Sequence, residues 1–128
     1  MNLFGSYRKL LGNSKQAMLA SIEVYNKPKF TYREEVFSIL LINSWELLFL
    51  AILSKNRDRI YAKKERGQDY MTLPFDMSLN KAKKYFPENI DYYGTSKNLY
   101  LLKEYRNKAV HFYNDAQSAH CVHVLAQA

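Results

Sequence analysis

The stretch "EYRNKAVHFYN", residues 104–114, contains Arg106 and His111, an arginine and a histidine five positions apart. A guanidinium group is permanently charged and planar, so it can pair with two phosphate oxygens and stabilise charge that develops on them. A histidine titrates near neutrality and can therefore take or give a proton. Together the two residues suit RNA cleavage, in which a 2′-hydroxyl loses a proton and the leaving 5′-oxygen gains one.

The same stretch has the periodicity of an amphipathic helix. At about 100° per residue from Leu102, the apolar stripe consists of Leu102, Tyr105, Ala109, Phe112 and Tyr113. Arg106 falls at about 40°, on the border of this stripe, whereas Asn107 and His111 fall at about 140° and 180°, facing away from it. One helix thus separates Arg106 from His111 by about 140°, but two copies packed across a two-fold axis could direct both residues at one phosphate.

Asn107 and His111 are four residues apart on one face, so Asn107 could help to hold or orient the same group as His111. The alternative is a solvated polar face without chemistry, because an Arg and a His at this spacing occur by chance in many chains. The spacing by itself leaves both interpretations open.

Glu46 interrupts the most apolar stretch of the chain, "VFSILLINSWELLFLAIL", residues 36–53. This stretch is slightly shorter than the roughly 20 residues that a membrane span requires, and a carboxylate near its middle would be costly in lipid. We therefore expect the central, nearly all-round buried helix of a soluble bundle and no membrane contact. A buried carboxylate needs a cation or several donors, and Arg106 is one candidate. A backbone group or a tyrosine hydroxyl is the other.

The remaining periodicity predicts a single, mostly helical domain over residues 1–128. Ser14 is a plausible N-cap for a helix over 14–26, and Thr31 with Glu34 forms a capping box for a helix to about residue 55. A short helix is expected over 78–86, followed by a loop at 91–96 hinged at Gly94. The remaining predictions are a helix from about 97 to 114, a further helix after Asp115, and a possible small β-hairpin around 57–73. The predicted fold class is an all-α bundle of four main helices plus a short one.

The charge balance and the cysteine count limit the partners and the compartment. Nineteen basic and twelve acidic side chains give a net charge of +7, which favours polyanionic partners such as nucleic acid. The single cysteine, Cys121, excludes an internal disulfide, and "MNLFGSYRKLLGNSKQ" lacks the apolar core of a signal peptide. A cytoplasmic location is therefore expected.

Two basic segments, residues 55–66 and 81–84, could attract RNA through its phosphates. Their candidate residues are Lys63, Lys64, Arg66, Lys83 and Lys84. As ordinary solvated surface they would look the same in the sequence, so both interpretations stay open. The run "HCVH", residues 120–123, offers two imidazoles and a thiol, but a structural zinc site needs four ligands and no second cluster exists. No metal site and no cofactor are predicted.

The motif "RNKAVH", Arg106 to His111, resembles the signature of the HEPN superfamily, in which an Arg and a polar residue precede a His on a late helix of an all-α bundle. The likeness extends through "SKQAMLASIEVYNKPKFTYREEVFSILLINSWELLFLAILSK", "YMTLPFDMSLNKAKKYFP" and "NLYLLKEYRNKAVH" to a bacterial HEPN-like family of unknown function. It covers about residues 14–113. The family commonly continues further at its C-terminal end, so we expect this chain to be a shortened form.

The resemblance implies a metal-independent endoribonuclease that acts as a homodimer in a toxin or anti-phage defence setting, leaving 2′,3′-cyclic phosphate ends. It implies that Arg106 and His111 are catalytic, with Asn107 as the polar neighbour. Glu46 is not part of this resemblance; if it pairs with Arg106, it would fix the guanidinium as a supporting residue. It further implies RNA as the substrate and an antitoxin or other defence protein as a partner. The alternative is a HEPN-like module that only binds RNA or dimerises.

"RNKAVHFY" also fits a longer form of the motif, with Tyr113 two positions after His111. In one HEPN toxin group, this tyrosine is adenylylated by a partner nucleotidyltransferase antitoxin. Tyr113 is therefore a candidate modification site, although its position beside the apolar stripe favours a packing role.

Overall fold

The computed structural model describes residues 5–111, with His111 described as backbone only. They form four α-helices: α1 (Tyr7–Asn26), α2 (Arg33–Lys55), α3 (Phe75–Ala82) and α4 (Tyr92–His111). A 3₁₀ turn, η1 (Lys83–Tyr85), directly continues α3. These residues contain no strand, so the predicted all-α fold class is confirmed for the described part of the chain.

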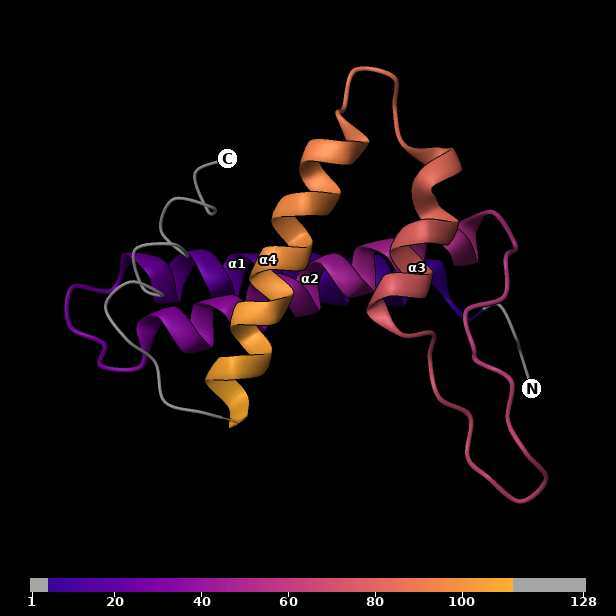
Figure 1. Cartoon of the computed structure of the whole chain (residues 1–128), viewed down its shortest axis with the longest axis horizontal. Coiled ribbons are helices and arrows are strands. Elements are labelled where there is room, and N and C mark those ends of the chain that lie inside the picture. Colours follow the sequence, from indigo (N-terminus) through magenta and orange to yellow (C-terminus); the bar gives the residue numbers. More distant parts are fainter. Residues whose placement is uncertain (1–4, 112–128) are drawn as a thin grey trace.

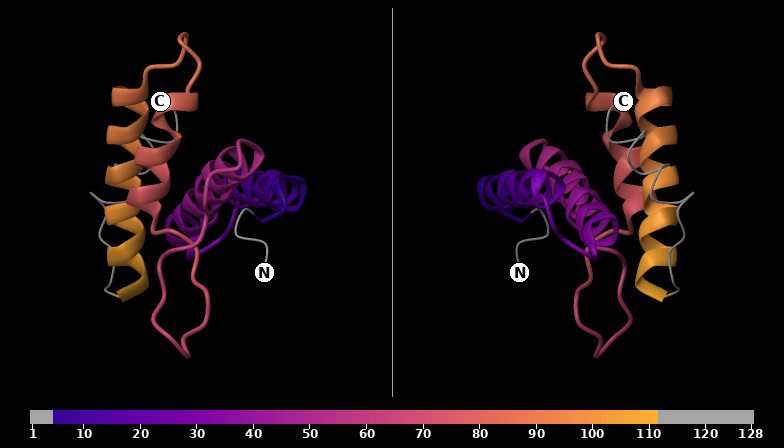
Figure 2. Two further views of the ribbon diagram at one scale, coloured as in Figure 1. Left: turned by 90° about the vertical axis from the view of Figure 1, so that its right-hand side faces the viewer. Right: turned by 90° about the vertical axis from the view of Figure 1, so that its left-hand side faces the viewer.

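The helices form two layers. The short connection 27–32 joins α1 and α2, which lie side by side in one layer, and α3 and α4 form a second layer against α2 (Figures 1 and 2). In Figure 1, α4 crosses the α1–α2 pair steeply. The loop 56–74 and the His111 end of α4 project from the same side of that pair (Figures 1 and 2).

The predicted start of the first helix, at Ser14, is wrong. The helix begins at Tyr7, and Ser14 is a buried residue in its middle. The Ser14 hydroxyl donates a hydrogen bond to the Ser44 carbonyl (2.8 Å), and the Ser44 hydroxyl donates one to the Ser14 carbonyl (3.0 Å). A serine that looks like a cap in the sequence therefore joins α1 to α2, because a small hydroxyl side chain also suits a close helix–helix contact.

The capping box predicted from Thr31 and Glu34 is also wrong. Tyr32 is the N-cap of α2, and no side chain caps this helix end. The first turn nevertheless contains Glu34 and Glu35, and negative charge is favourable at a helix N-terminus.

Two further helix boundaries differ from the prediction. α3 begins at Phe75, directly after Pro74, rather than at Ser78. α4 begins at Tyr92, so Gly94 lies within its first turn and is not the hinge of a loop. A Cβ at Gly94 would lie 2.6 Å from an Asp91 carboxylate oxygen, so glycine serves the close approach of that side chain rather than a bend.

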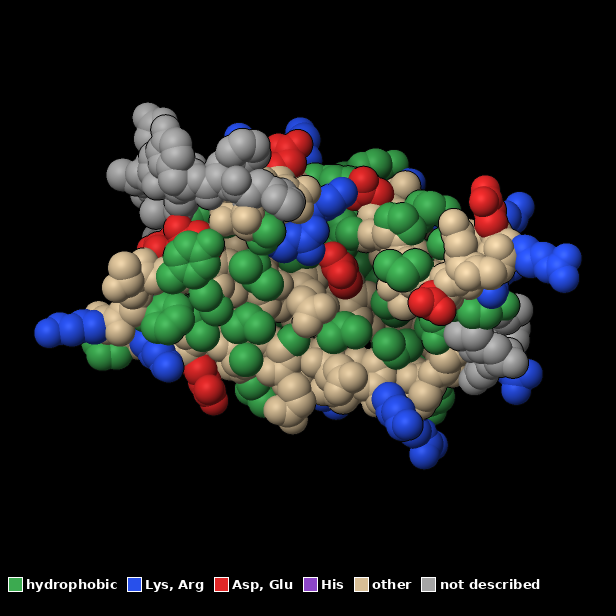
Figure 3. Space-filling view, turned by 90° about the horizontal axis from the view of Figure 1, so that it is seen from below, with side chains coloured by type: hydrophobic (Ala, Val, Ile, Leu, Met, Phe, Trp, Pro, Cys, Tyr) green, Lys and Arg blue, Asp and Glu red, His purple; other side chains and the backbone are tan. Residues whose placement is uncertain are grey.

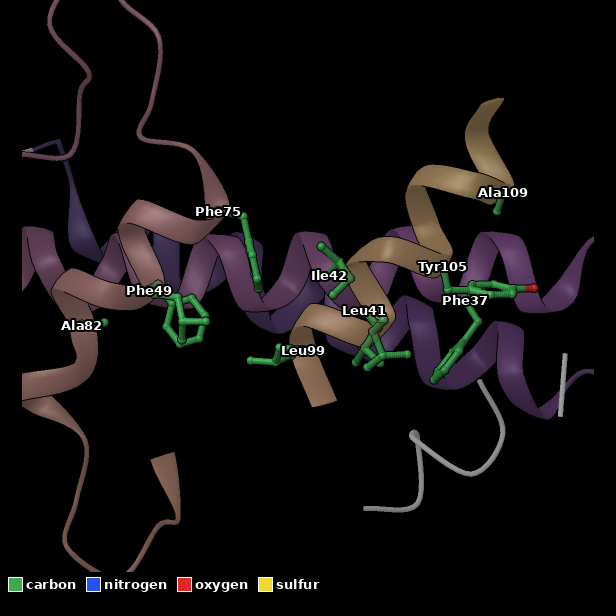
Figure 4. Close-up of a cluster of buried hydrophobic side chains, with 11 residues drawn as sticks. Phe37, Leu41, Ile42, Phe49, Phe75, Ala82, Leu99, Tyr105 and Ala109 are labelled. Atoms are coloured by element: carbon green, nitrogen blue, oxygen red, sulfur yellow. The ribbon is translucent and has the colours of Figure 1, made fainter. Parts of the chain in front are cut away.

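The main core lies between α2 and the second layer (Figure 4). Its buried members are Phe37, Leu41, Ile42 and Phe49 of α2, Phe75, Leu79 and Ala82 of α3, and Leu99, Leu102, Tyr105 and Ala109 of α4. Phe49 is almost fully buried and has the rings of Trp45, Phe75 and Phe86 about it, with centroid distances of 5.7, 6.0 and 6.1 Å. Burial of this core holds α4 against α2.

The prediction that α2 is nearly all-round buried is confirmed, because only Asn43 and Lys55 of its residues are exposed. By length and composition alone, α2 could also cross a membrane, with a mean hydropathy of 2.1 over its most apolar 18 residues. Half of that window is buried inside the protein. The central helix of a soluble bundle has the same character.

The predicted hairpin around 57–73 exists only as an antiparallel loop with a single bridge, between Tyr61 and Thr72. Ile60 and Leu73 are buried at its base in a second apolar cluster with Leu50 and Leu53. The residues of the tip, 63–69, are all exposed. Full strands do not form, because a two-stranded ribbon with such a polar tip has no apolar surface to pack against.

Candidate functional site

Arg106 forms an ion pair with Glu46 that joins α4 to α2. Its Nη1 donates to Glu46 Oε1 at 2.9 Å, and the side chains are 22% and 32% exposed. Of the two partners that the sequence left open for Glu46, the structure selects Arg106. The pair is half-buried at the edge of the α2–α4 contact, which agrees with the border position of Arg106 on the helical wheel.

Asn107 holds the same guanidinium from the other side. Arg106 Nη2 donates to Asn107 Oδ1 at 3.2 Å. These two bonds occupy two of the five N–H donors of the guanidinium and fix the plane of the group. The other donors provide the fork that arginine uses to bind a phosphate.

Two further contacts position the part of α4 that precedes His111. Lys103 Nζ lies 2.8 Å from Asp76 Oδ1 and joins α4 to α3. The Tyr32 hydroxyl donates a hydrogen bond to the Ala109 carbonyl at 3.0 Å and joins α4 to the start of α2. Together with the buried Tyr105 and Ala109, these contacts hold α4 in a defined register on α2.

His111 is the last described residue of α4. Five helical residues after Arg106 correspond to about 7.5 Å along the helix axis. The candidate modification site Tyr113 and the run His120, Cys121 and His123 lie outside the described residues.

The predicted RNA-binding lysines and arginine do not gather at Arg106. Lys63, Lys64 and Arg66 are exposed on the loop 56–74, where Lys64 Nζ donates to the Gln68 carbonyl and lies 4.5 Å from the Tyr70 ring centroid. Figure 3 shows Lys and Arg side chains standing apart on the face seen from below, with hydrophobic side chains between them.

The two lysines on η1 have partners of their own. Lys83 Nζ lies 5.2 and 5.0 Å from the ring centroids of Tyr92 and Tyr93, and Lys84 pairs with Asp58 at 3.4 Å. No hydrogen bond or ion pair within the described part of the chain joins any of the five predicted cations to Arg106, Asn107 or Glu46.

The sequence analysis missed Arg8, which meets Lys55 and Arg57 of the basic segment 55–66 where the start of α1 meets the end of α2. One local signal for this group exists: Arg57 lies two residues after the predicted end of α2, where a glycine is usual. The proximity of Arg8 to the other two residues has no local signal.

The comparisons with known proteins connect the chain to one family. The model of the family described as "Domain of unknown function (DUF3644)" matches residues 9–128. The chain belongs to this family. The DUF3644 match includes Glu46, Arg106, Asn107 and His111, so the whole candidate site lies within the family domain. No curated protein and no solved structure matches the chain.

Proposed function

We propose that this DUF3644 protein is a metal-independent endoribonuclease of the HEPN-like type, acting in the cytoplasm as part of a toxin or anti-phage defence system. The observation that carries the proposal is the fixed guanidinium of Arg106, which is bonded to both Glu46 and Asn107 five residues before His111. An arginine held in this way is oriented before any substrate arrives, and preorganised charge is an effective form of transition-state stabilisation.

In the proposed reaction, the 2′-oxygen of a ribose attacks the neighbouring phosphorus and the bond from phosphorus to the 5′-oxygen breaks. His111 accepts the 2′-hydroxyl proton or gives a proton to the leaving 5′-oxygen. Arg106 pairs with the non-bridging phosphate oxygens, on which charge develops. The products are a 2′,3′-cyclic phosphate and a 5′-hydroxyl, and the reaction requires no cofactor.

The proposed site is completed by a second copy of the chain. On one helix, Arg106 and His111 are separated by about 140° around the axis, so a single α4 directs them poorly at one phosphate. Val110 is four residues after Arg106, on the same side of α4, and is 55% exposed. An exposed apolar side chain beside the site supports a contact between two α4 helices across a two-fold axis.

A specific observation favours the alternative, a HEPN-like module that binds RNA or dimerises without cleaving. The Glu46 carboxylate already offsets the charge of Arg106, and an ion pair between two helices is a sufficient structural reason for both residues. In that case His111 is ordinary helix surface.

The test is cleavage of a labelled single-stranded RNA in EDTA, with analysis of the product ends. Wild-type protein is expected to yield 2′,3′-cyclic phosphates, and Arg106→Ala and His111→Ala are each expected to lower the rate by roughly 100-fold or more. Lys108→Ala, which removes an exposed charge from the same helix, is the matched control. Circular dichroism and sedimentation of each variant check the fold and the dimer.

Three results contradict the proposal in different ways. If His111→Ala cleaves RNA at the wild-type rate, His111 is not a catalytic residue. RNA binding by a folded wild-type protein without cleavage selects the alternative. A wild-type protein that cleaves as a monomer overturns the shared site.

A further inference from the structure

A cavity of about 540 Å³ lies where the N-terminus of α1 meets the C-terminus of α2. Its lining residues are Gly5, Ser6, Tyr7, Arg8, Ser54, Lys55 and Arg57. Three of these seven residues are cationic and none is acidic. The volume is within the range of small-ligand sites, so the cavity can hold a group of nucleotide size.

The three cations have no carboxylate partner among the described residues. The three ion pairs within that part of the chain involve Lys84, Lys103 and Arg106, and none involves Arg8, Lys55 or Arg57. Asp58, the nearest acid in the sequence, pairs with Lys84 and Tyr85 instead. The positive charge at the cavity therefore has no counter-ion within the described fold.

The Tyr7 phenol lies beside these cations, and its pKa is affected by them. Arg8 Nε donates a hydrogen bond to the Tyr7 hydroxyl, and this bond, with the charges of Arg8 and Lys55, lowers the pKa of the Tyr7 phenol. Arg8 of α1 and Lys55 of α2 both line the cavity together with Tyr7, so cations of two helices border the same small space. An anion in the cavity would meet both.

The start of α1 adds backbone donors to this positive region. The first N–H groups of a helix have no intrahelical acceptor, and the helix dipole favours an anion there. Ser6, the N-cap, makes no side-chain cap bond, and the first turn contains no acidic residue. The helix end is therefore left without the carboxylate or hydroxyl acceptor that usually occupies it.

Ser54 gives a second and independent indication of a ligand. It is only 6% exposed, it lines the cavity, and its hydroxyl forms no hydrogen bond with any described residue. The Ser54 hydroxyl oxygen is not itself fully buried, so a ligand that fills the cavity can reach it. An oxygen-rich ligand in the cavity would supply a hydrogen-bond partner.

Arg57 has a left-handed backbone conformation, which is usually adopted by glycine. Its φ is 59°, and the N–H groups of Arg57 and Asp58 donate to the carbonyls of Ser54 and Leu53, the pattern of a Schellman motif. The left-handed residue of that motif is usually glycine, because glycine alone avoids the steric cost. An arginine at this position places a guanidinium beside the cavity, although its backbone conformation carries a steric cost that glycine would avoid.

We propose that this cavity binds the phosphate monoester of a nucleotide-sized ligand. Arg8, Arg57 and the free N–H groups of α1 bind the phosphate oxygens, Lys55 adds a point charge, and the Ser54 hydroxyl donates to the ligand. The Tyr7 ring offers a face on which a base can stack. The site is separate from Arg106, because Lys55 is nine residues, or about 13 Å, from Glu46 along α2. It does not depend on the proposed nuclease activity.

The test is isothermal titration of the full chain with inorganic phosphate, adenosine monophosphate and adenosine at one ionic strength. Adenosine monophosphate is expected to bind, adenosine is not, and the signal is expected to exceed that of an equal addition of sodium chloride. If inorganic phosphate and adenosine monophosphate bind with equal affinity, the ligand of the cavity is free phosphate. If the nucleotide binds more tightly, the ligand is a phosphorylated nucleoside.

Substitutions of the residues that line the cavity test whether the phosphate binds there. Arg57→Gly is expected to weaken this binding by about tenfold or more while the fold persists, since glycine suits that backbone. Lys55→Gln and Ser54→Ala are expected to weaken it less, and Lys29→Gln, an exposed cation in the connection before α2, is expected to leave it unchanged. The proposal is overturned by binding no stronger than that of chloride, or by binding that survives in both Arg57→Gly and Lys55→Gln.

Discussion

Arg106 and Glu46 are 60 residues apart in the sequence, and their side chains meet at 2.9 Å across the α2–α4 contact. This pair fixes the guanidinium on which the proposed chemistry depends. It also contributes to the fold, so its two roles can be measured separately.

The first prediction concerns the strength of this ion pair. Because both side chains are partly exposed, a double-mutant cycle of Glu46→Gln and Arg106→Gln is expected to give a coupling free energy of about 0.5–1 kcal/mol in urea unfolding. If Glu46 positions Arg106 for catalysis, Glu46→Gln also lowers kcat and leaves KM nearly unchanged. A coupling of zero would show that the pair does not stabilise the fold.

The second prediction concerns the reciprocal hydrogen bonds between Ser14 and Ser44, which are 5% and 2% exposed. Each alanine substitution removes one bond and is expected to cost about 1 kcal/mol. Ser14→Leu is expected to cost clearly more, because the extra volume pushes α1 away from α2. Denaturant unfolding measures all three, and a Ser14→Leu variant as stable as Ser14→Ala would contradict the close packing.

The third prediction concerns the hydrogen bond from Tyr32 to the Ala109 carbonyl. Tyr32→Phe is expected to cost about 0.5–1.5 kcal/mol of unfolding free energy and to lower the cleavage rate, because the end of α4 before His111 loses an anchor. Tyr70→Phe is the control, since the Tyr70 hydroxyl makes no hydrogen bond to any described residue. Equal effects of the two substitutions would remove any special role from Tyr32.

The fourth prediction concerns acid stability. The hydrogen bond from Tyr85 to Asp58, with a smaller contribution from the Lys84 charge, lowers the pKa of the Asp58 carboxyl. A depressed carboxyl pKa stabilises the fold fully above the unfolded value of about 3.9, and the stabilisation is lost as pH falls through the folded value. The stability difference between wild type and Asp58→Asn is therefore expected to be constant from about pH 5 to 7 and to shrink below about pH 4. Unfolding of both proteins across this range, with the exposed Asp69→Asn as control, tests it.

The fifth prediction concerns the left-handed backbone of Arg57. Arg57→Gly is expected to raise the free energy of unfolding by about 0.5–1 kcal/mol, because glycine adopts this conformation without steric cost. Thermal unfolding measures the change. A gain in stability together with a loss of phosphate binding would show that the arginine is retained for a ligand and not for the fold. A loss of stability would show instead that the Arg57 side chain supports the fold.

The sequence by itself determined the features that depend on local periodicity. The all-α class, the central position of α2 and the apolar face of α4 follow from the spacing of apolar residues, and the structure agrees for Leu102, Tyr105 and Ala109. The border position of Arg106 followed from the same spacing. The family likeness and the roles of Arg106 and His111 stay predictions, because they concern chemistry that geometry alone does not test.

The tertiary structure decided what depends on contacts between distant segments. Ser14 and Thr31 both have the local chemistry of a cap, but packing of α1 on α2 buries Ser14 and moves the start of α1 to Tyr7. The choice of Arg106 as the partner of Glu46 required the crossing of α4 over α2. The meeting of Arg8 with Lys55 and Arg57 required the return of the chain between α1 and α2. Local propensity acts over a few residues, whereas these three relationships span 30 to 60 residues, so only the folded chain could establish them.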